Sequence, residues 1–396
     1  MGLDVIAAEP AAEIDPQHPF LWIDTISGSP LHQWGRRTNR TSFVVRVYAC
    51  SVLLTYVPMA AAAIAGPLPL LRRDPSLRLP FGYDWNIAFM FLFSFPALVL
   101  LTMTDHSVLN SALRRVQREG VLVVDARTAG TLAEKWRARF HRVNSMAYLL
   151  AVIAGLGVAA FNYVAYTPAD VGYWIATDGH LVLPGYVFLT SVFLFFGLLP
   201  VYIMRNIAIS VFLKDLVDHS ELRLLPFHPD RCGGIRPVGE LGLRSQYALT
   251  VLGLNVISLV AISFLYLRIP PWLDGLIIAA AIGYAFLGPV VFMGPLLPFR
   301  AGMLKTKAEL MSEVAHRLRI ELQRLRTQLP AGELTKDDER LIKRLRKLGS
   351  VIDELPVWPF DAGTLKRFVT FYILPMASAV GYPLVQFVIR KVTQQQ

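Results

Sequence analysis

The residue types best suited to chemistry are concentrated in one short segment, 225–237, which reads LPFHPDRCGGIRP. His228, Asp230 and Cys232 stand at alternate positions, and zinc binds all three side-chain types. Alternate residues share a face only in an extended strand. A second pair of ligands with the usual zinc spacing is missing, and one loop rarely supplies a whole metal site. We keep these three residues as metal candidates, but we expect no metal and no other cofactor.

A structural role explains the same segment more simply. Asp230 can cap a turn or the helix that starts near Val238, and the two glycines after Cys232 can adopt positive φ. Arg231 can pair with Asp230 or with a lipid phosphate. A tight charged loop on a rigid scaffold can also couple helices or bind a ligand. The coupling or ligand candidates are therefore His228, Asp230, Arg231, Cys232, Gly233 and Gly234.

Catalytic motifs are absent from the sequence. It contains no Walker loop, no dinucleotide-binding glycine pattern, no HExxH and no GxSxG. The net charge of +10 comes without zinc-finger spacing or an aromatic RNA-binding signature. Its bases flank apolar runs, where the positive-inside rule and anionic lipid account for them. We expect neither an enzyme nor a nucleic-acid-binding protein, and membrane lipid is the expected partner.

The sequence contains seven long uncharged stretches, and the elements that they form must hold any functional site in place. The chain is 54% hydrophobic and only 17% charged, and its charges fall in blocks between these stretches. A helix needs roughly 20 mainly apolar residues to cross the hydrocarbon core. Each stretch meets this requirement, so we predict an all-α, polytopic transmembrane helix bundle with about seven spans. The stretches are Val47–Leu71, Trp85–Thr104, Val143–Ala169, Leu181–Met204, Ser245–Leu267, Gly275–Phe299 and Phe368–Ile389.

The distribution of basic residues predicts the orientation. Eight Lys or Arg residues lie in the connection 105–142, and the connection 205–244 is also basic. The connection 167–180 has two aspartates and no Lys or Arg. The positive-inside rule therefore places the N-terminus and the two basic connections in the cytoplasm. The connection 72–84, with three arginines, fits this orientation less well.

Polar groups within and beside the spans are few. No Asp, Glu, Lys or Arg lies inside the seven stretches, which argues against proton-coupled transport. Asp105 and His106 directly follow the second stretch and could form a gate at the inner mouth, although a solvated helix end is the ordinary expectation. Asn255 should bond to a neighbouring helix, and the small residues Ala151, Gly155 and Ala159 favour close helix contact.

The last stretch has the features of a pore lining. Pro375, Gly381 and Pro383 interrupt it, and broken membrane helices lie within protein or beside a water-filled cavity. A kinked anchor helix with interhelical hydrogen bonds is the alternative. The candidate pore-lining residues are Tyr372, Tyr382 and Gln386.

Residues 300–355 predict a helical hairpin outside the membrane. Two series repeat every seven residues, and residues 330–332 (PAG) end the first helix. A second helix should bury Leu341, Leu345, Leu348 and Ile352 against it. The stripe can pack within the chain or between subunits. The repeating residues are Leu304, Met311, Leu318 and Leu325, with Ala308, Ala315, Leu322 and Leu329.

This organisation resembles that of insect chemoreceptor channels, which have seven spans, an inside N-terminus and a polar last span. That family ends in Tyr, five residues and Gln-Phe. Gln386-Phe387 is present here, but Val380 occupies the position of the tyrosine. The resemblance is one of organisation and assigns no family.

These patterns favour an oligomeric ion channel or pore lined by the last span, in the plasma or inner membrane. The alternatives are a non-conducting sensor or scaffold that binds a cytoplasmic protein through the hairpin, and a facilitative transporter. A homo-oligomer is expected. The predicted regions are a cytoplasmic segment at 1–43, six spans in 44–299 with cytoplasmic loops at 105–142 and 205–244, the cytoplasmic hairpin at 300–355, and a crossing or re-entrant helix at 366–391.

Overall fold

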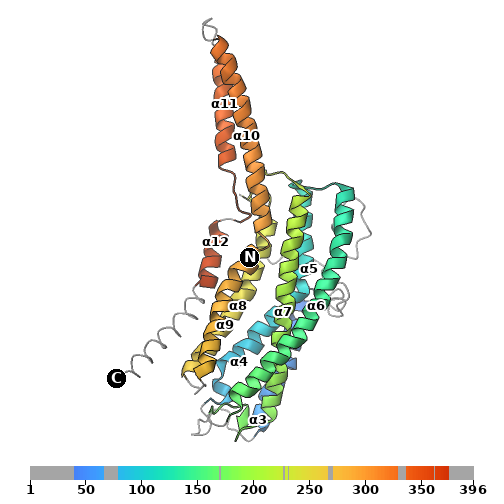
Figure 1. Ribbon diagram of the computed structural model, residues 1–396, viewed down its shortest axis with the longest axis vertical. Helices are drawn as coiled ribbons and strands as arrows, with labels where there is room; N and C mark the ends of the chain where they lie inside the picture. The colour runs from blue at the N-terminus through green and yellow to red at the C-terminus, as the bar shows by residue number, and fades with distance from the viewer. Residues whose placement is uncertain are drawn as a thin grey trace, which may run out of the picture.

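The computed structural model describes residues 40–66, 79–168, 171–225, 228–230, 232–265, 271–328, 336–360 and 362–373. These residues are mostly helical, as the sequence predicts. Long helices form a bundle, and two further helices project from one end of it (Figure 1). We call that end the projection end and the opposite end the far end.

The first part of the chain supplies most of the bundle. A π-helix, η3, joins α4 to α5, so the three form one long rod. The elements are α2 (Arg40–Leu54), α3 (Tyr56–Ala65), the 3-10 turn η2 (Phe81–Tyr83), α4 (Trp85–Phe89), η3 (Met90–Ser94), α5 (Phe95–Arg118), α6 (Ala126–Tyr166) and α7 (Leu183–Asp218).

The second part adds helices on one side of this group and forms the projection. The elements are α8 (Arg236–Leu265), α9 (Pro271–Met293), α10 (Leu297–Gln328), α11 (Lys336–Asp353), α12 (Ala362–Phe368) and the π-helix η5 (Val369–Ile373). Two short antiparallel ribbons close the connections. They pair β1 (Leu122–Val123) with β4 (Glu221–Leu222), and β2 (Ala176–Thr177) with β3 (His180–Leu181).

Helix α6 begins well before the apolar stretch that predicted it. Asp125 caps it, because its carboxylate accepts a hydrogen bond from the Arg127 amide at 3.2 Å. The following turns are amphipathic and bury Leu132, Trp136 and Phe140 at helical spacing. A hydropathy window misses these turns because their outer face is charged.

Helices α6 and α7 pack closely along their lengths (Figure 1). A Cβ on Gly155 would lie 2.7 Å from the backbone oxygen of Phe193, and one on Gly197 would lie 3.2 Å from the oxygen of Ala151. The small residues thus bring the two backbones together, as the sequence predicts. Helix α7 also continues unbroken to Asp218, beyond Met204 where its apolar stretch ends.

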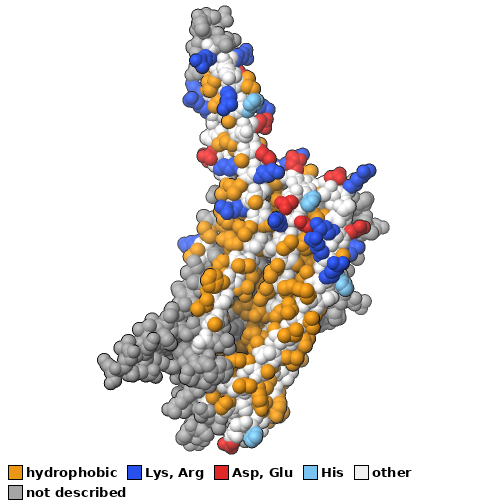
Figure 2. Space-filling model, viewed as in Figure 1, with side chains coloured by type: hydrophobic (Ala, Val, Ile, Leu, Met, Phe, Trp, Pro, Cys, Tyr) orange, Lys and Arg blue, Asp and Glu red, His pale blue; other side chains and the backbone are white. Residues whose placement is uncertain are grey.

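Within the described residues, five helices are long and apolar enough to cross a membrane, and a bent pair makes a sixth if it counts as one span. Apolar side chains cover the visible face of the bundle, and charged ones gather where the projection begins (Figure 2). Most of the predicted seventh span lies outside the described residues, as do Tyr382 and Gln386. The seven-span topology therefore stays a prediction.

The projection consists of α10 and α11, which lie side by side (Figure 1). Helix α10 follows α9 after a break at residues 294–296, with a bend of 46°. The two helices pack through Val314, Ile352 and Leu355. Residues 329–335, which would join them, lie outside the described residues, so the hairpin stays a prediction.

Two residues of the predicted stripe on α11 do not pack inside the chain. Leu341 is 37% exposed and Leu348 is 48% exposed, so the expectation that they are buried is wrong. The physical reason is the choice of contact face, since Val314 and the series residue Met311 of α10 pack with Ile352 at the end of the stripe. Neither Leu341 nor Leu348 belongs to this cluster. Of the two seven-residue series, Leu325 is buried, whereas Leu304 and Leu322 are exposed.

Candidate functional site

The predicted loop is a tight turn organised by one carboxylate. Asp230 accepts hydrogen bonds from the amides of Cys232 at 2.8 Å, Gly234 at 3.1 Å and Arg236 at 3.2 Å. Gly233 and Gly234 have φ values of 70° and 90°, which confirms the expected positive φ. The turn therefore ends directly at the start of α8.

His228 connects this turn to the end of α5. Its Nδ1 lies 2.8 Å from Asp230 Oδ1, and its Nε2 lies 3.7 Å from Glu119 Oε2. A Cβ on Gly234 would lie 2.5 Å from a methyl of Val121, so the turn also presses against the segment before β1. The loop thus ties the end of α5 to the start of α8, as a coupling element would.

Burial and hydrogen bonding act in opposite directions on the pKa of Asp230. Partial burial opposes ionisation, but hydrogen bonds from the amides of Cys232 and Gly234 and from His228 outweigh it. The pKa of Asp230 therefore lies below its ordinary value, and the carboxylate is ionised at neutral pH.

The metal candidates do not form a metal-binding set. Among the described residues, no group of three His, Cys, Asp or Glu side chains could hold a metal ion. Cys232 is buried, Cys50 is exposed, and the two do not form a disulfide bond. Arg231 lies outside the described residues. The loop therefore has a structural organisation in which Asp230 bonds to backbone amides.

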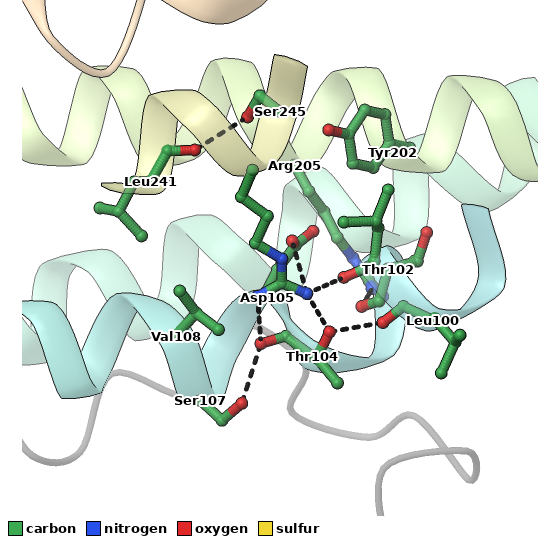
Figure 3. A network of polar contacts seen from close by, with 12 residues as sticks. Leu100, Thr102, Thr104, Asp105, Ser107, Val108, Tyr202, Arg205, Leu241 and Ser245 are labelled. Atoms are coloured by element: carbon green, nitrogen blue, oxygen red, sulfur yellow. Dashed lines mark hydrogen bonds and ion pairs between the residues drawn. The ribbon is translucent and has the colours of Figure 1, made fainter. Parts of the chain in front are cut away.

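Asp105 is the principal correction to the sequence analysis. The ordinary expectation was a solvated helix end, but the side chain is only 11% exposed and lies among α5, α7 and α8 (Figure 3). Its Oδ1 is 3.9 Å from an Arg244 guanidinium nitrogen, and its buried Oδ2 has no hydrogen-bond partner. The neighbouring His106 is also buried and contacts Asn110 at 3.1 Å.

Arg205 joins three helices at the level of Asp105 in the bundle. Although it lies on α7, its Nε donates to Asn144 Oδ1 on α6 at 3.0 Å. Its two terminal nitrogens donate to the Thr102 carbonyl on α5 at 3.2 Å and to the Tyr148 hydroxyl on α6 at 3.3 Å. Only 3% of this residue is exposed. A guanidinium so far from solvent is stable only because these acceptors surround it.

Arg244 binds α5 from the opposite side, on α8. It donates to the carbonyls of Thr104 at 3.1 Å and Leu101 at 3.3 Å, and it also contacts the Thr104 hydroxyl. Beside it, the Ser245 hydroxyl donates to Asn206 Oδ1 on α7 at 3.2 Å. We call Asp105, Arg205 and Arg244 the charged cluster.

Polar contacts continue from the charged cluster toward the far end, between the α4–η3–α5 rod and α8. The Ser94 hydroxyl donates to the Val251 carbonyl at 3.3 Å, and the Asn255 amide donates to Ser94. Closer to the far end, the Ser258 hydroxyl donates to Asn86 Oδ1 at 2.9 Å. The Asn255 contact confirms the expected bond to a neighbouring helix.

These contacts form a polar seam between the rod and the antiparallel α8. At about 1.5 Å per residue it extends over roughly 27 Å along the rod, from Asn86 to Thr104, close to the ~30 Å hydrocarbon core of a bilayer, and over roughly 21 Å along α8. At its middle, Asn255 Oδ1 is buried and has no hydrogen-bond partner. The π-helix η3 ends at Ser94, and such π-bulges are frequent at functional sites. The polar seam consists of Asn86, Ser94 and Thr104 on one side and of Ser258, Asn255 and Arg244 on the other.

A second buried carboxylate stabilises the far end. Asp84 caps α4 by accepting from the Ile87 amide at 3.2 Å, and it also accepts from the Tyr173 hydroxyl at 2.5 Å and from the Trp174 indole at 2.9 Å. Burial raises the pKa of Asp84, and the hydrogen bonds from Trp174 and Tyr173 oppose that effect without cancelling it. This group fixes the segment between α6 and α7 to the start of α4.

Tyr372 is the one pore-lining candidate among the described residues. It is buried, and its hydroxyl donates to the carbonyls of Tyr284 at 3.0 Å and Ala285 at 2.6 Å on α9. A pore lined by the last span stays a prediction, because Tyr382 and Gln386 lie outside the described residues.

The charged cluster is not evident from the apolar stretches, because its three members flank them. Asp105 follows the second stretch, Arg205 follows the fourth, and Arg244 precedes the fifth. All three flanks were predicted to lie on the same side of the membrane. That coincidence is the signal that could have brought the three residues together.

Comparison with known proteins assigns no relative to this chain. No protein-family model, no curated protein and no solved structure matches it. The resemblance to insect chemoreceptor channels therefore gains no support, and the argument for function rests on the site.

Proposed function

We propose that this chain is an integral membrane protein that moves a small solute across the membrane along the polar seam. The observation that carries the proposal is the extent of the seam, which is close to the thickness of the hydrocarbon core and ends at the charged cluster. The charged cluster is then the gate at one mouth of the path. This is the role considered for Asp105 from the sequence.

A purely structural seam is the competing explanation. Interhelical hydrogen bonds in membranes contribute only about 0.6 kcal/mol each on average. A buried acceptor without a partner costs about 1–3 kcal/mol, and there are two here, Asn255 Oδ1 in the seam and Asp105 Oδ2 in the charged cluster. Apolar packing would avoid that cost, so helix association alone gives little reason for these residues. Ionisable groups at membrane depth generally belong to a functional path.

The orientation follows from the charges at the two ends. The connections 105–142 and 205–244 and the projection are rich in Lys and Arg. Under the positive-inside rule this supports a cytoplasmic projection end, in a plasma or inner membrane. We extend the same proposal to a pore lined by the last span, a homo-oligomer and a seven-span topology. The seam itself requires none of these three features. A facilitative transporter and a channel both fit a path within one chain.

One observation favours a second function, a scaffold that binds a cytoplasmic protein. Leu304, Leu322 and Leu348 are exposed on the projection. The base of α10 is fixed to the bundle, because the Thr306 hydroxyl donates to the Leu222 carbonyl at 3.1 Å and Arg300 lies 4.3 Å from the Trp358 ring. A partner bound to the projection would therefore contact a rigid extension of the bundle.

Solute flux in proteoliposomes separates the two functions. Asn255→Leu removes the amide at the middle of the seam and should slow flux by about tenfold or more, the effect of 1.4 kcal/mol on a barrier. Asn162→Leu is the matched control, because within the described part of the chain Asn162 bonds only to the Val158 carbonyl of its own helix, at 2.8 Å. Flux that is absent in the unmodified protein, or equal in all three proteins, contradicts the proposal.

A further inference from the structure

We infer that the polar seam selects small, uncharged solutes that donate hydrogen bonds, the class that includes urea and glycerol. The inference rests on the proposed translocation along the seam and adds the class of substrate. The class of substrate is inferred from the charges and the unpaired acceptors. A solute would meet these one after another between the projection end and the middle of the bundle.

Cations are excluded by the charged cluster. It contains two guanidinium groups and one carboxylate, so its formal charge is +1. Among the described residues, no second Asp or Glu lies within 4.0 Å of Arg205 or Arg244. A cation that leaves water here meets an uncompensated positive charge where the low dielectric strengthens repulsion. Arginine excludes protons and cations from other membrane pores in the same way.

Anions are disfavoured by the acceptors of the seam. Asp105 Oδ2 and Asn255 Oδ1 are both buried and have no hydrogen-bond partner. The side-chain amide of Asn255 cannot exchange the positions of its oxygen and nitrogen without losing a hydrogen bond, since the nitrogen already donates to the Val251 carbonyl at 3.1 Å. The net positive charge of the cluster attracts an anion, but at the middle of the seam the anion meets Asn255 Oδ1, which repels negative charge. The Asn255 nitrogen cannot compensate, because it already donates to Val251 and Ser94.

A neutral donor satisfies both positions. Its N–H or O–H groups can bond to Asp105 Oδ2 at the gate and to Asn255 Oδ1 at the middle of the seam. From Arg244 to Asn255 the path covers roughly 16 Å at about 1.5 Å per residue. Bonding to an acceptor that otherwise has no partner recovers its desolvation cost, which is the physical source of selectivity for donors. The side chains now contact one another across the seam, so passage requires α8 to move slightly away from the rod.

The test compares solutes in the same proteoliposomes. Stopped-flow light scattering would measure urea and glycerol permeability, and a voltage-sensitive dye would measure K⁺ and Cl⁻ movement. We expect urea or glycerol permeability about tenfold or more above that of empty liposomes, with no K⁺ or Cl⁻ movement. Ion movement without urea or glycerol flux overturns the selectivity and leaves translocation standing. The absence of every flux overturns both.

Two substitutions test the charge argument directly. Arg244→Gln makes the formal charge of the cluster zero and should admit K⁺, whereas Arg244→Lys keeps the charge and should remain impermeable to K⁺. If Arg244→Gln does not fold, Arg205→Gln provides the same change of charge from another helix. Identical K⁺ impermeability in the folded glutamine and lysine variants overturns the inference.

Discussion

Arg205 shows how a single side chain can set the position of several helices. Its guanidinium lies on α7, but every acceptor that surrounds it belongs to α5 or α6. A charge removed from water costs several kcal/mol unless such acceptors replace its hydration. The geometry of these acceptors therefore fixes α7 against its neighbours at the projection end.

Replacement of this arginine should destabilise the bundle. Arg205→Gln loses hydrogen bonds from a charged donor and leaves Asn144 Oδ1 buried near an incomplete partner, so we expect a loss of about 3 kcal/mol. Thermal unfolding in detergent, followed by size-exclusion chromatography, measures the effect. Arg137→Gln, at an exposed position on α6, is the control and should change stability very little. Equal stability of the two variants contradicts this account of Arg205.

Asp84 provides a pH-dependent prediction at the far end. Its pKa is raised in the folded state, so ionisation opposes folding. Stability should therefore fall as pH rises from the ordinary pKa of about 3.9 through the folded value, and Asp84→Asn should remove this dependence. Unfolding of both proteins between acidic and neutral pH measures the difference. Parallel pH profiles would contradict the assignment.

At this scale the sequence predicted local features better than distant ones. The positive φ of Gly233 and Gly234 and the capping role of Asp230 follow from residue types within a few positions. The contact between Asp105 and Arg244 joins positions that are far apart in the chain. It depends on the register of α5 against α8, which hydropathy does not report.

Among the elements, the α6–α7 pair has the tightest helix contact that the sequence predicted. Gly155 has almost no space beside Phe193, whereas a Cβ on Gly157, on the same helix, would meet nothing within 4 Å. Gly155→Ala should separate the helices and cost about 1–3 kcal/mol. Gly157→Ala should be neutral or slightly stabilising. Thermal unfolding in detergent compares the two variants, and equal losses would show that the close contact does not matter.

The turn before α8 should respond to acid. Because the folded pKa of Asp230 is lowered, its stabilisation is complete above the ordinary pKa of about 3.9 and disappears as pH falls through the folded value. Asp230→Ala should lose about 1–3 kcal/mol at neutral pH, because three amides lose their acceptor. Asp178→Asn, an exposed change in the β2–β3 turn, is the control for unfolding. A stable Asp230→Ala variant would contradict the organisation of the turn.

The elements also show where pattern recognition was insufficient. The apolar stretches located the membrane-length helices because about 20 apolar residues are unusual in any other setting. The same method placed the start of α6 at Val143, since it does not detect amphipathic turns. On α10 the seven-residue spacing was real, and Met311 of one series packs with Val314 and Ile352, whereas Leu322 of the other series is exposed. Spacing alone does not decide which of two apolar faces is buried.

For the whole molecule, the proposed orientation places the projection in the cytoplasm and the β2–β3 turn outside. Arg319→Cys lies on the projection, and His180→Cys lies at the far end, both at exposed positions. In a chain without Cys50, an impermeant maleimide should label His180→Cys in intact cells and Arg319→Cys only after permeabilisation. Cys232 is buried and should stay unreactive. Labelling of both positions from the same side would contradict the orientation.

The central claim is that water and solute enter the polar seam, and thiol reactivity at its middle tests this claim most directly. Thiols react as thiolates, which form in water and not in lipid. Ser94→Cys, at the seam, is compared with Leu149→Cys, on the exposed apolar face of α6. A small uncharged thiol reagent should modify Ser94→Cys in liposomes at least about tenfold faster than Leu149→Cys. If both thiols are equally unreactive, the seam is dry and the account is wrong.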